Sequence, residues 1–304
     1  MRVDGERATY AAAGVSLATA EAIVERLRAA VESTGATGFG AFAGVHPLDE
    51  RRLLVASTDS VGTKLVLARE RGALRACGAD LAAHCINDVL TTGAQPLMLL
   101  DYVAANAIEL EQVAELVEGA AQVCREAGCA LVGGETAELP GIYRDEELDF
   151  AGTCVGIVER ERVIDGSRVE AGDAVVGLPS AGVHANGFTL VRRILEHDDY
   201  RGDDLLAPTR LYLQEVRALQ ARTDVRALAH VTGGGIAGNL ARVLPDGLRA
   251  KLDWNAWERP PVFNWLGQHV EEDELRRVFN LGIGYCAVVS DPGDSLVIGR
   301  IVRS

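Results

Sequence analysis

The amino-acid sequence predicts an α/β protein, with the mixed strand and helix order of the α+β class, that is divided into two domains. Apolar runs of strand length alternate with longer segments of helical periodicity. Glycine-rich turns follow several of the strand-like runs. A polar, turn-rich stretch near Asp165 interrupts this pattern, and 304 residues suffice for two ordinary domains. We therefore expect an N-terminal domain over residues 1–164 and a C-terminal domain over residues 165–304.

The first half predicts four helices and four strands. Helical periodicity is found at residues 17–34, 64–72, 77–93 and 109–128, and strand-like runs lie at 51–59, 96–105, 129–136 and 148–160. The strand at 96–105 is apolar enough to be buried. The segment "GFGAFAG" (residues 38–44) is either a loop that closes over a ligand or a flexible connector.

The second half mixes the same elements. Strands are predicted at residues 174–182, 279–290 and 295–303, and helices at 186–197 and 208–222. Residues 225–244 combine a strand, a glycine turn and a helix. Each half therefore has enough elements for a sheet with helices packed on it.

Composition and charge limit the function classes. Apolar residues make up 48% and aromatic residues 5% of the chain, so the core should be aliphatic. No apolar run approaches the roughly 18–20 residues of a membrane span, and the N-terminus lacks the apolar segment of a signal peptide, so we expect a cytoplasmic protein. A net charge of −14 argues against a nucleic-acid partner. The acidic excess suggests the hypothesis of a high-salt cytoplasm.

The cysteines and lysines are informative by their spacing and number. The six cysteines show no C-x-x-C spacing and lie mostly in apolar surroundings, which favours reduced buried thiols over a metal site or disulfides. Lysine occurs only at Lys64 and Lys251, while every other basic residue except histidine is arginine. A compact ammonium group beside a glycine turn therefore stands out at Lys64.

Three carboxylates of the first half lie in or directly after apolar strands. Asp59 ends a strand, Asp101 lies within "LMLLDYV", and Glu135 follows "CALVGG". An unpaired charge in such surroundings is costly, so Asp101 and Glu135 are either structural ion-pair partners or ligand-binding groups. Together the carboxylates resemble the oxygen ligands that Mg²⁺ takes along with substrate phosphates.

The helix at residues 77–93 carries a polar stripe. Its members stand at positions i, i+4, i+7 and i+8 and so share one helical face: Asp80, His84, Asn87 and Asp88. A solvated face is the ordinary explanation of such a stripe. Solvated faces usually carry Glu, Lys and Arg, however, and the short Asp, His and Asn side chains favour a functional face.

Glycine turns supply what a phosphate group needs. Gly62, the pair Gly133–Gly134 and the run Gly233–Gly235 all follow predicted strands, where glycine lets backbone N–H groups approach an anion. One such turn is also an ordinary connection. Three of them together with an acidic cluster favour a phosphate-bearing ligand.

The segment "STDSVGTK" (residues 57–64) is not a P-loop. That motif requires G-x-x-x-x-G-K-[ST], whereas here the first glycine is missing and Thr63 precedes Lys64. A strand, a carboxylate, a glycine turn and a lysine can still bind a phosphate bridged by a metal ion. In the second half, "SAGVHANG" places His184 and Asn186 in a glycine-bounded turn, where Asn186 as a helix N-cap is the alternative to a binding role.

Eight blocks resemble, in order, those of the phosphoribosylformylglycinamidine cyclo-ligase family of purine biosynthesis. They are "STDSVGTKL", "DLAAHCINDVLTTGAQPLMLLDY", "ALVGGETAELPGIY", "VIDGSRVEAGD", "SAGVHANGFTLVRRIL", "LLAPTRLY", "AHVTGGGIAGNLARVLPD" and "FNLGIGY". The resemblance runs from about Tyr10 to about Tyr285. It implies a two-domain fold whose N-terminal domain forms a homodimer through a mixed sheet and binds nucleotide in a cleft. The implied reaction is ATP-dependent ring closure of formylglycinamidine ribonucleotide to 5-aminoimidazole ribonucleotide, with an iminophosphate intermediate formed on the formyl oxygen.

The resemblance also implies roles for single residues. Mg²⁺ would be bound by Asp59, Asp88 and Glu135, with Asp80 and Asp101 in support. The expected catalytic residues are Lys64, His184 and Asp101, and no general base is assigned beyond the candidates His84 and His184. ATP and substrate would be held by Asp59, Gly62, Thr63, Lys64, Gly133, Gly134, Thr136, Asn186, Gly233 and Gly234.

The chain departs from the family near its end. After "FNLGIGYCAVVS" the family has a further helix, but here "DPGDSL" leads almost directly into the last strand. Without that helix, one face of the C-terminal sheet needs another cover. Formylglycinamidine synthase, thiamine monophosphate kinase and selenophosphate synthetase share the superfamily and its acidic cleft, and a non-catalytic scaffold is a further alternative. The retained Asp59, Lys64, Asp88, Glu135 and His184 argue against the scaffold.

Overall fold

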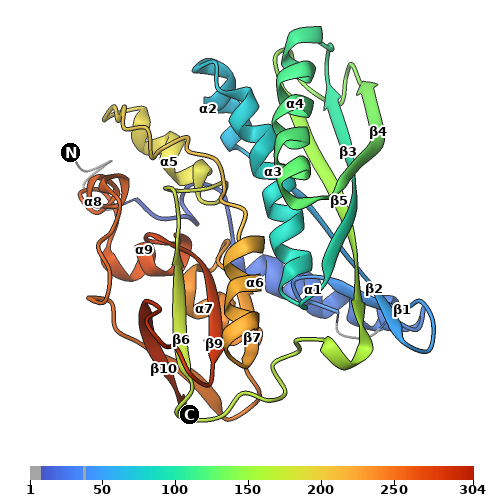
Figure 1. The fold of residues 1–304 in the computed structure, drawn as a ribbon. Helices are drawn as coiled ribbons and strands as arrows, with labels where there is room; N and C mark the ends of the chain where they lie inside the picture. Colours follow the sequence, from blue (N-terminus) through green and yellow to red (C-terminus); the bar gives the residue numbers. More distant parts are fainter. Residues whose placement is uncertain (1–7, 37–38) are drawn as a thin grey trace.

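Two five-stranded sheets, one from each half of the chain, organise the structure (Figure 1). The computed structural model describes residues 8–36 and 39–304. The two sheets are formed by strands on either side of Asp165, in a mixed α/β arrangement with helices packed on both sheets. No helix in the described part of the chain is both long and apolar enough to cross a membrane.

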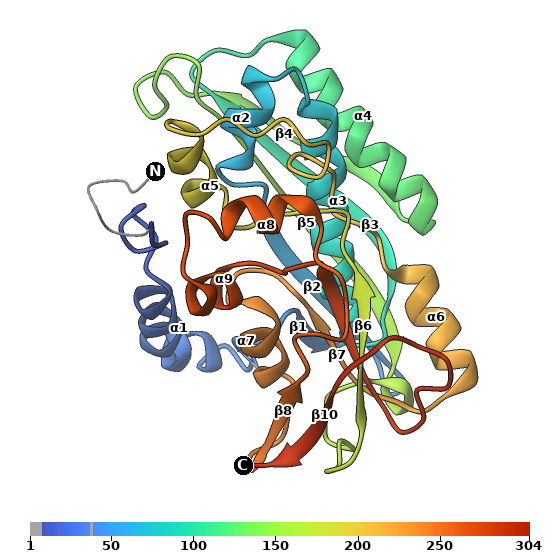
Figure 2. The ribbon, with the colours of Figure 1, turned by 90° about the vertical axis from the view of Figure 1, so that its left-hand side faces the viewer.

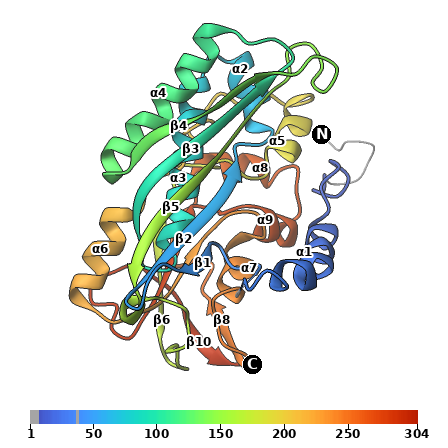
Figure 3. The same cartoon turned by 90° about the vertical axis from the view of Figure 1, so that its right-hand side faces the viewer.

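The first sheet has the order β1-β2-β5-β3-β4. Its strands are β1 (Gly44–Pro47), β2 (Arg52–Ser60), β3 (Gln95–Ala105), β4 (Ala130–Glu138) and β5 (Leu148–Glu159), and only β3 and β4 run parallel. The helices α3 (Leu74–Leu90) and α4 (Leu110–Ala127) cover one face, as Figure 3 shows from the side of the sheet. On the other face Leu100 is 41% and Val132 is 55% exposed, so β3 is buried on one side only and not on both.

Two glycines hold α3 and α4 unusually close together. A Cβ atom on Gly78 of α3 would lie 1.9 Å from the carbonyl oxygen of Leu116, and one on Gly119 of α4 would lie 2.0 Å from that of Arg75. The helix backbones therefore touch at this crossing, where any larger residue would collide with a main chain. This contact fixes α3 to the first sheet.

The second sheet has the order β7-β9-β6-β10-β8 and is antiparallel throughout. Its strands are β6 (Ala174–Pro179), β7 (Val225–His230), β8 (Leu248–Leu252), β9 (Ile283–Val289) and β10 (Val297–Arg303). The helices of this half are α5 (Phe188–Leu195), α6 (Leu213–Arg222), α7 (Gly235–Ala241), α8 (Pro261–Leu266) and α9 (Glu272–Val278). Figure 2 shows α7, α8 and α9 on one side of the sheet and α6 towards the other.

The predicted loss of a helix between the last two strands is found in the structure, since residues 290–296 join β9 to β10 directly. On the α6 side of the sheet, Lys251 of β8 pairs with Arg300 of β10. Arg249 lies two residues before Lys251 on β8 and so on the same face. All three side chains are exposed. The part of this face that α6 leaves open is therefore covered by long basic side chains whose stems shield the strands.

The sequence predicted most elements but missed several. α1 (Leu17–Glu32), α2 (Lys64–Glu70) and η1 (Arg160–Arg162) complete the fold, and β1, β8, α8, α9 and η1 were not expected. α6 begins only at Leu213. The pair Gly133–Gly134 lies inside β4 beside a register shift against β3, not in a turn after a strand. Of the segment 38–44, residue 38 lies outside the described residues.

The core crosses the boundary between the halves. One cluster of buried apolar residues joins α3, α4 and the first sheet to side chains of the second half, among them Tyr212, Val216 and Tyr285. The first described residues also contact the second half, because the N–H groups of Ala8 and Tyr10 donate to His269 and Glu274. Both halves therefore meet along a broad, partly apolar seam.

Candidate active site

The polar stripe of α3 lies in the seam between the two halves. Asp80, His84, Asn87 and Asp88 share one face, as predicted, and all four are buried, so the stripe is not a solvated surface. Figure 1 shows α3 running through the centre of the molecule beside the second half. The Asn87 amide donates to the Arg210 carbonyl oxygen at 2.8 Å and accepts from the Tyr212 N–H at 3.1 Å. The stripe thus fastens the second half to α3.

Lys64 lies at the same seam and forms a buried ion pair. Its Nζ is 2.7 Å from Asp80 Oδ2 and donates to the Ala207 carbonyl oxygen at 3.0 Å, and both charged side chains are fully buried. Asp80 Oδ1 accepts from the N–H and the hydroxyl of Thr209, each at 2.7 Å. The sequence suggested that Lys64 extends from the turn towards a phosphate. In this structure its ammonium group is instead directed to Asp80 and the Ala207 carbonyl oxygen. The partner that holds it is Asp80, sixteen residues further along the chain.

Asp59 and His84 form a pair at the edge of the seam. Asp59 Oδ2 is 3.1 Å from His84 Nδ1, and Asp59 Oδ1 accepts from the Ser60 N–H at 2.7 Å. Burial alone raises the pKa of Asp59, but the hydrogen bond and charge of His84 outweigh it and leave that pKa below its ordinary value. Burial likewise opposes the charged form of His84, and Asp59 more than offsets this, so the pKa of His84 is raised.

Asp88 forms a second carboxylate–histidine pair beside the first. Its Oδ1 is 2.8 Å from His230 Nδ1, and its Oδ2 accepts from the Ser57 hydroxyl at 3.0 Å. The His84 and His230 rings meet edge to face, with centroids 4.9 Å apart. Burial lowers the pKa of His230, since Asp88 offsets the loss of solvation only in part. In the described structure His230 Nε2 is buried without a hydrogen-bond partner.

His184 and Asn186 bring the turn after β6 to these pairs. His184 adopts the left-handed backbone conformation with φ 65°, and its buried Nδ1 has no partner among the described residues. Burial holds the pKa of His184 well below its ordinary value. The Asn186 amide lies 3.4 Å from His84 Nε2, and Gly233 lies next to the same amide. The H-x-N turn and the glycine run thus meet the α3 stripe.

A cleft of ≈ 780 Å³ opens beside this network at the predicted glycine turn. Gly62, with φ 67°, and Thr63 line it together with Arg69 and Arg192. Thr63 joins the cleft to the seam, because its hydroxyl is 3.0 Å from that of Thr189. Arg69 pairs with Glu146 at 3.4 Å, whereas Arg192 has no ion-pair partner in the described structure. Backbone N–H groups and a free guanidinium here can bind an anion.

Of the predicted site residues on β3 and β4, Asp101 lies on the face of the sheet that carries this region, and Glu135 lies on the other face. Asp59 and Asp101 both pair with Gly152 of β5, so they stand in one row on the helix-covered face. Burial raises the pKa of Asp101. Glu135 pairs with Tyr102, the neighbour of Asp101, and strand alternation therefore puts it on the opposite face.

The trio expected to bind metal is thus not assembled within one chain. Asp59 and Asp88 lie on the α3 side of the first sheet, and Glu135 lies on its open side. Within residues 8–36 and 39–304 no three His, Cys, Asp or Glu side chains are arranged to hold a metal ion. Gly134 packs against Asp101, where a Cβ atom would lie 2.0 Å from the Asp101 carbonyl oxygen, and Thr136 follows on the same strand.

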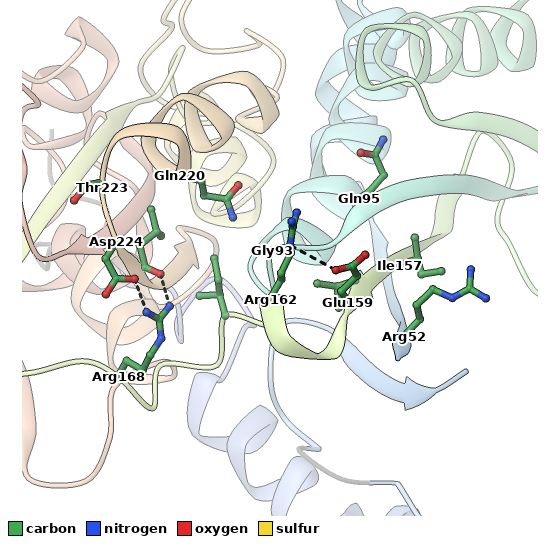
Figure 4. A pocket seen from close by; sticks show the side chains of 13 residues that line it. Arg52, Gly93, Gln95, Ile157, Glu159, Arg162, Arg168, Gln220, Thr223 and Asp224 are labelled. Carbon is green, nitrogen blue, oxygen red and sulfur yellow. Dashed lines mark hydrogen bonds and ion pairs between the residues drawn. The ribbon is translucent and has the colours of Figure 1, made fainter. Parts of the chain in front are cut away.

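A second cleft, ≈ 640 Å³, lies at the other end of the seam (Figure 4). Two of its arginines already form ion pairs, since Arg168 pairs with Asp224 and the Arg162 guanidinium lies 3.6 Å from the Glu159 carboxylate. None of the residues expected to act in the site lines this cleft. It is therefore the weaker candidate.

Sequence reasoning missed four residues of the site. Three of them, Ser57, Thr209 and His230, bond to residues 31 to 142 positions away. The fourth, Arg192, lines the cleft beside Gly62 and Thr63. A signal existed for His230, because it directly precedes the glycine run that follows β7. Arg192 lies in the block "SAGVHANGFTLVRRIL", but nothing singled it out there, since a basic residue on an amphipathic helix is ordinary.

The sequence of both halves matches known protein families and curated relatives. Residues 40–158 match the family model "AIR synthase related protein, N-terminal domain", and residues 170–297 match its C-terminal counterpart. A phosphoribosylformylglycinamidine cyclo-ligase of Sorangium cellulosum is 48% identical over 97% of this chain and 92% of its own, and one of Synechococcus is 45% identical over 95% and 90%.

Solved structures show the same fold. The thiamine monophosphate kinase of Aquifex aeolicus superposes with a TM-score of 0.63 at 18% identity over 92% of this chain and 93% of its own. PurL of T. maritima complexed with FGAR superposes with a TM-score of 0.61 at 18% identity over 88% of this chain and 45% of its own. Because it is 45–48% identical to these curated relatives over nearly its full length, the chain belongs to the phosphoribosylformylglycinamidine cyclo-ligase family.

Proposed function

We propose that the protein catalyses ATP-dependent ring closure of formylglycinamidine ribonucleotide to 5-aminoimidazole ribonucleotide, with release of ADP and phosphate, in purine biosynthesis in the cytoplasm. The observation that carries the proposal is the meeting of three family blocks at one place. The turn after β2, the α3 stripe and the H-x-N turn adjoin at the seam. These blocks come from a chain that is 48% identical to a cyclo-ligase.

The nucleotide phosphates are proposed to bind in the cleft beside Gly62 and Thr63. The backbone turn and the Arg192 guanidinium supply N–H donors there. A kinase of the same fold is complexed with AMPPCP and TMP, and PurL is complexed with ADP, which supports a nucleotide site in this fold. Because Lys64 is held by Asp80, we assign it the role of fixing the helix that starts at this turn.

The carboxylates of this region fit Mg²⁺ in part. Asp59 is 36% exposed at its side chain and lies at the edge of the seam, which suits an ion that takes one or two carboxylates plus phosphate oxygens. Asp88, 12% exposed, would be the second ligand, whereas Glu135 is left out because of its place on the other face. Bound there, Mg²⁺ would offset the charge of the phosphates.

The chemistry then depends on positioning. The formyl oxygen of the substrate attacks the γ-phosphorus of ATP, and the resulting iminophosphate loses phosphate when the amidine nitrogen attacks its carbon. Asn186 and the run Gly233–Gly235 would orient the substrate, since they adjoin His84 and the seam. A group must take up the proton released by the amidine, and His84 and His184 are the candidates.

The open face of the first sheet is proposed to pair with the same face of a second copy. Leu100 and Val132 are exposed there, beside the Thr58–Thr153 hydroxyl contact at 2.8 Å. A sheet that is apolar on both faces needs a cover on each. A homodimer would supply it and would place Glu135 at the interface.

The test is an assay of purified protein with ATP, Mg²⁺ and formylglycinamidine ribonucleotide, scored for aminoimidazole ribonucleotide. The high acidity of the chain requires both low and high salt conditions. Product that depends on ATP and on the formylated substrate supports the proposal. A folded protein that forms no product in either condition would refute it.

A further inference from the structure

Four of the six cysteines gather at one place beneath the first sheet. Cys85 of α3, Cys124 of α4, Cys129 before β4 and Cys154 of β5 are all buried, and all are free thiols. The Cys85 thiol already has a hydrogen-bond partner, because its S–H donates to the Gly152 carbonyl oxygen at 3.4 Å. The thiols of Cys124 and Cys154 neighbour the sulfur of Cys129 and lower the pKa of Cys129. The proposed reaction uses none of these groups.

The end of α4 fixes the distance between Cys124 and Cys129. Gly128 caps the helix in the left-handed conformation, φ 65°, and the Cys129 N–H donates to the Cys124 carbonyl oxygen at 2.9 Å. This is the Schellman arrangement, in which a contact between the side chains of these two positions is frequent. A hydrogen bond between their main chains keeps their Cα atoms within the separation of roughly 4.4–6.8 Å that a disulfide needs.

Cys154 does not meet this requirement. The register pairs Leu99 of β3 with both Cys154 of β5 and Leu131 of β4, so β3 lies between the two strands. Two strand spacings amount to roughly 9.5 Å, which exceeds the range for a disulfide without movement of the backbone. Cys154 therefore neighbours Cys129 but cannot bridge to it.

We infer that Cys129 and Cys124 form an oxidation-sensitive thiol pair, which a hydroperoxide converts into a disulfide across the C-terminal cap of α4. Cys129 is the entry point because it is 6% exposed, against 2% for Cys124 and none for Cys154. The neighbouring Cys124 and Cys154 thiols hold the pKa of Cys129 below its ordinary value, while burial acts in the opposite direction. The thiolate is the reactive form of cysteine.

The step is balanced with hydrogen peroxide as the oxidant. The Cys129 sulfur attacks one peroxide oxygen, the O–O bond breaks, and the departing hydroxide takes up the thiol proton as water. The Cys124 sulfur then attacks the resulting sulfenic acid, the S–O bond breaks, and a second water leaves with the Cys124 proton. Two thiols are oxidised and one peroxide is reduced to two waters.

The disulfide would lie directly before β4. That strand carries Gly133, Gly134 and Glu135, so the pair sits at the base of a predicted site element. The inference itself does not depend on the proposed function, because its readout is chemical and needs no substrate.

The experiment treats the folded full-length protein with hydrogen peroxide, then denatures it and alkylates the remaining thiols. A disulfide gives a mass loss of about 2 Da and leaves four of the six cysteines open to alkylation. Arg125 lies between the two cysteines, so trypsin yields two peptides that only the disulfide joins.

Three variants make the assignment specific. Cys129→Ser should lose the crosslinked peptide pair. Cys154→Ala should keep it with slower formation, because only the neighbouring thiol that lowers the pKa of Cys129 is lost. Cys286→Ser, at a buried thiol far along the chain, is the matched control and should behave as the wild type. Absence of the crosslink in the folded wild type, or a crosslink to Cys154 instead, would overturn the inference. Should Cys129→Ser fail to fold, the wild-type peptide map alone decides.

Discussion

Replacing Asp80 by leucine should be among the most damaging single changes in this protein. The substitution leaves the Lys64 ammonium buried, with the Ala207 carbonyl oxygen as its remaining polar contact and the Phe188 ring 5.5 Å away. It also removes the acceptor for the N–H and hydroxyl of Thr209. Removing one partner of a buried ion pair costs about 3–5 kcal/mol, a large share of a total stability of about 5–15 kcal/mol.

The assay is urea denaturation of four proteins: the wild type, Asp80→Leu, Lys64→Met with Asp80→Leu, and the surface control Glu118→Ala. The double variant should be more stable than Asp80→Leu because it removes the stranded charge, and it should fold even where the single variant does not. Glu118 pairs with Arg75 on the surface, with side chains 57% and 56% exposed, so the control should lose less than about 1 kcal/mol. A loss for Asp80→Leu no larger than that of the control would refute the reasoning.

Four further outcomes are expected. Asp88→Asn keeps the contacts to its neighbours but should lower the turnover number at least about 100-fold, while size-exclusion chromatography shows an unchanged assembly; wild-type turnover would remove this residue from the site. Arg192→Gln should raise the KM for ATP more than it lowers kcat, and equal effects on both would point to a merely structural role. His184 is held neutral in the folded state and takes a proton in the unfolded state below about pH 6.5, so the free energy of unfolding should fall from pH 7 to 5 by at most about 1.4 kcal/mol per pH unit from this group. The variant His184→Asn, which tolerates φ 65°, should flatten that slope, and an unchanged slope in denaturation curves would contradict the assignment. Leu100→Asp should convert the proposed dimer to a folded monomer in light scattering, and an intact dimer would exclude this face as the interface.

Patterns that are local in the sequence predicted the structure well. The spacing of Asp80, His84, Asn87 and Asp88 alone placed them on one face of a helix, because helical geometry needs no tertiary information. The strands on either side of Asp165 followed from periodicity in the same way.

Features that depend on distant contacts were predicted poorly. A glycine pair suits a bulge within a strand as well as a turn after one, which is why Gly133–Gly134 was placed wrongly. The direction of Lys64 depends on Asp80, and the place of His230 depends on Asp88, 142 residues away. The face on which Glu135 lies follows from pairing with β3, which a single strand cannot reveal.

The apolar cluster that joins α3 to Tyr212 and Tyr285 has a consequence for how the molecule can be divided. Two separate family models match the chain, one on each side of Asp165, yet the halves share one core and the Lys64–Asp80–Thr209 contacts at their boundary. The chain should therefore melt in one calorimetric transition. Expression of either half alone would expose the apolar side chains of the shared core to water and would remove Thr209 from the Lys64–Asp80 pair. Co-expressed fragments should therefore be recovered only as a complex.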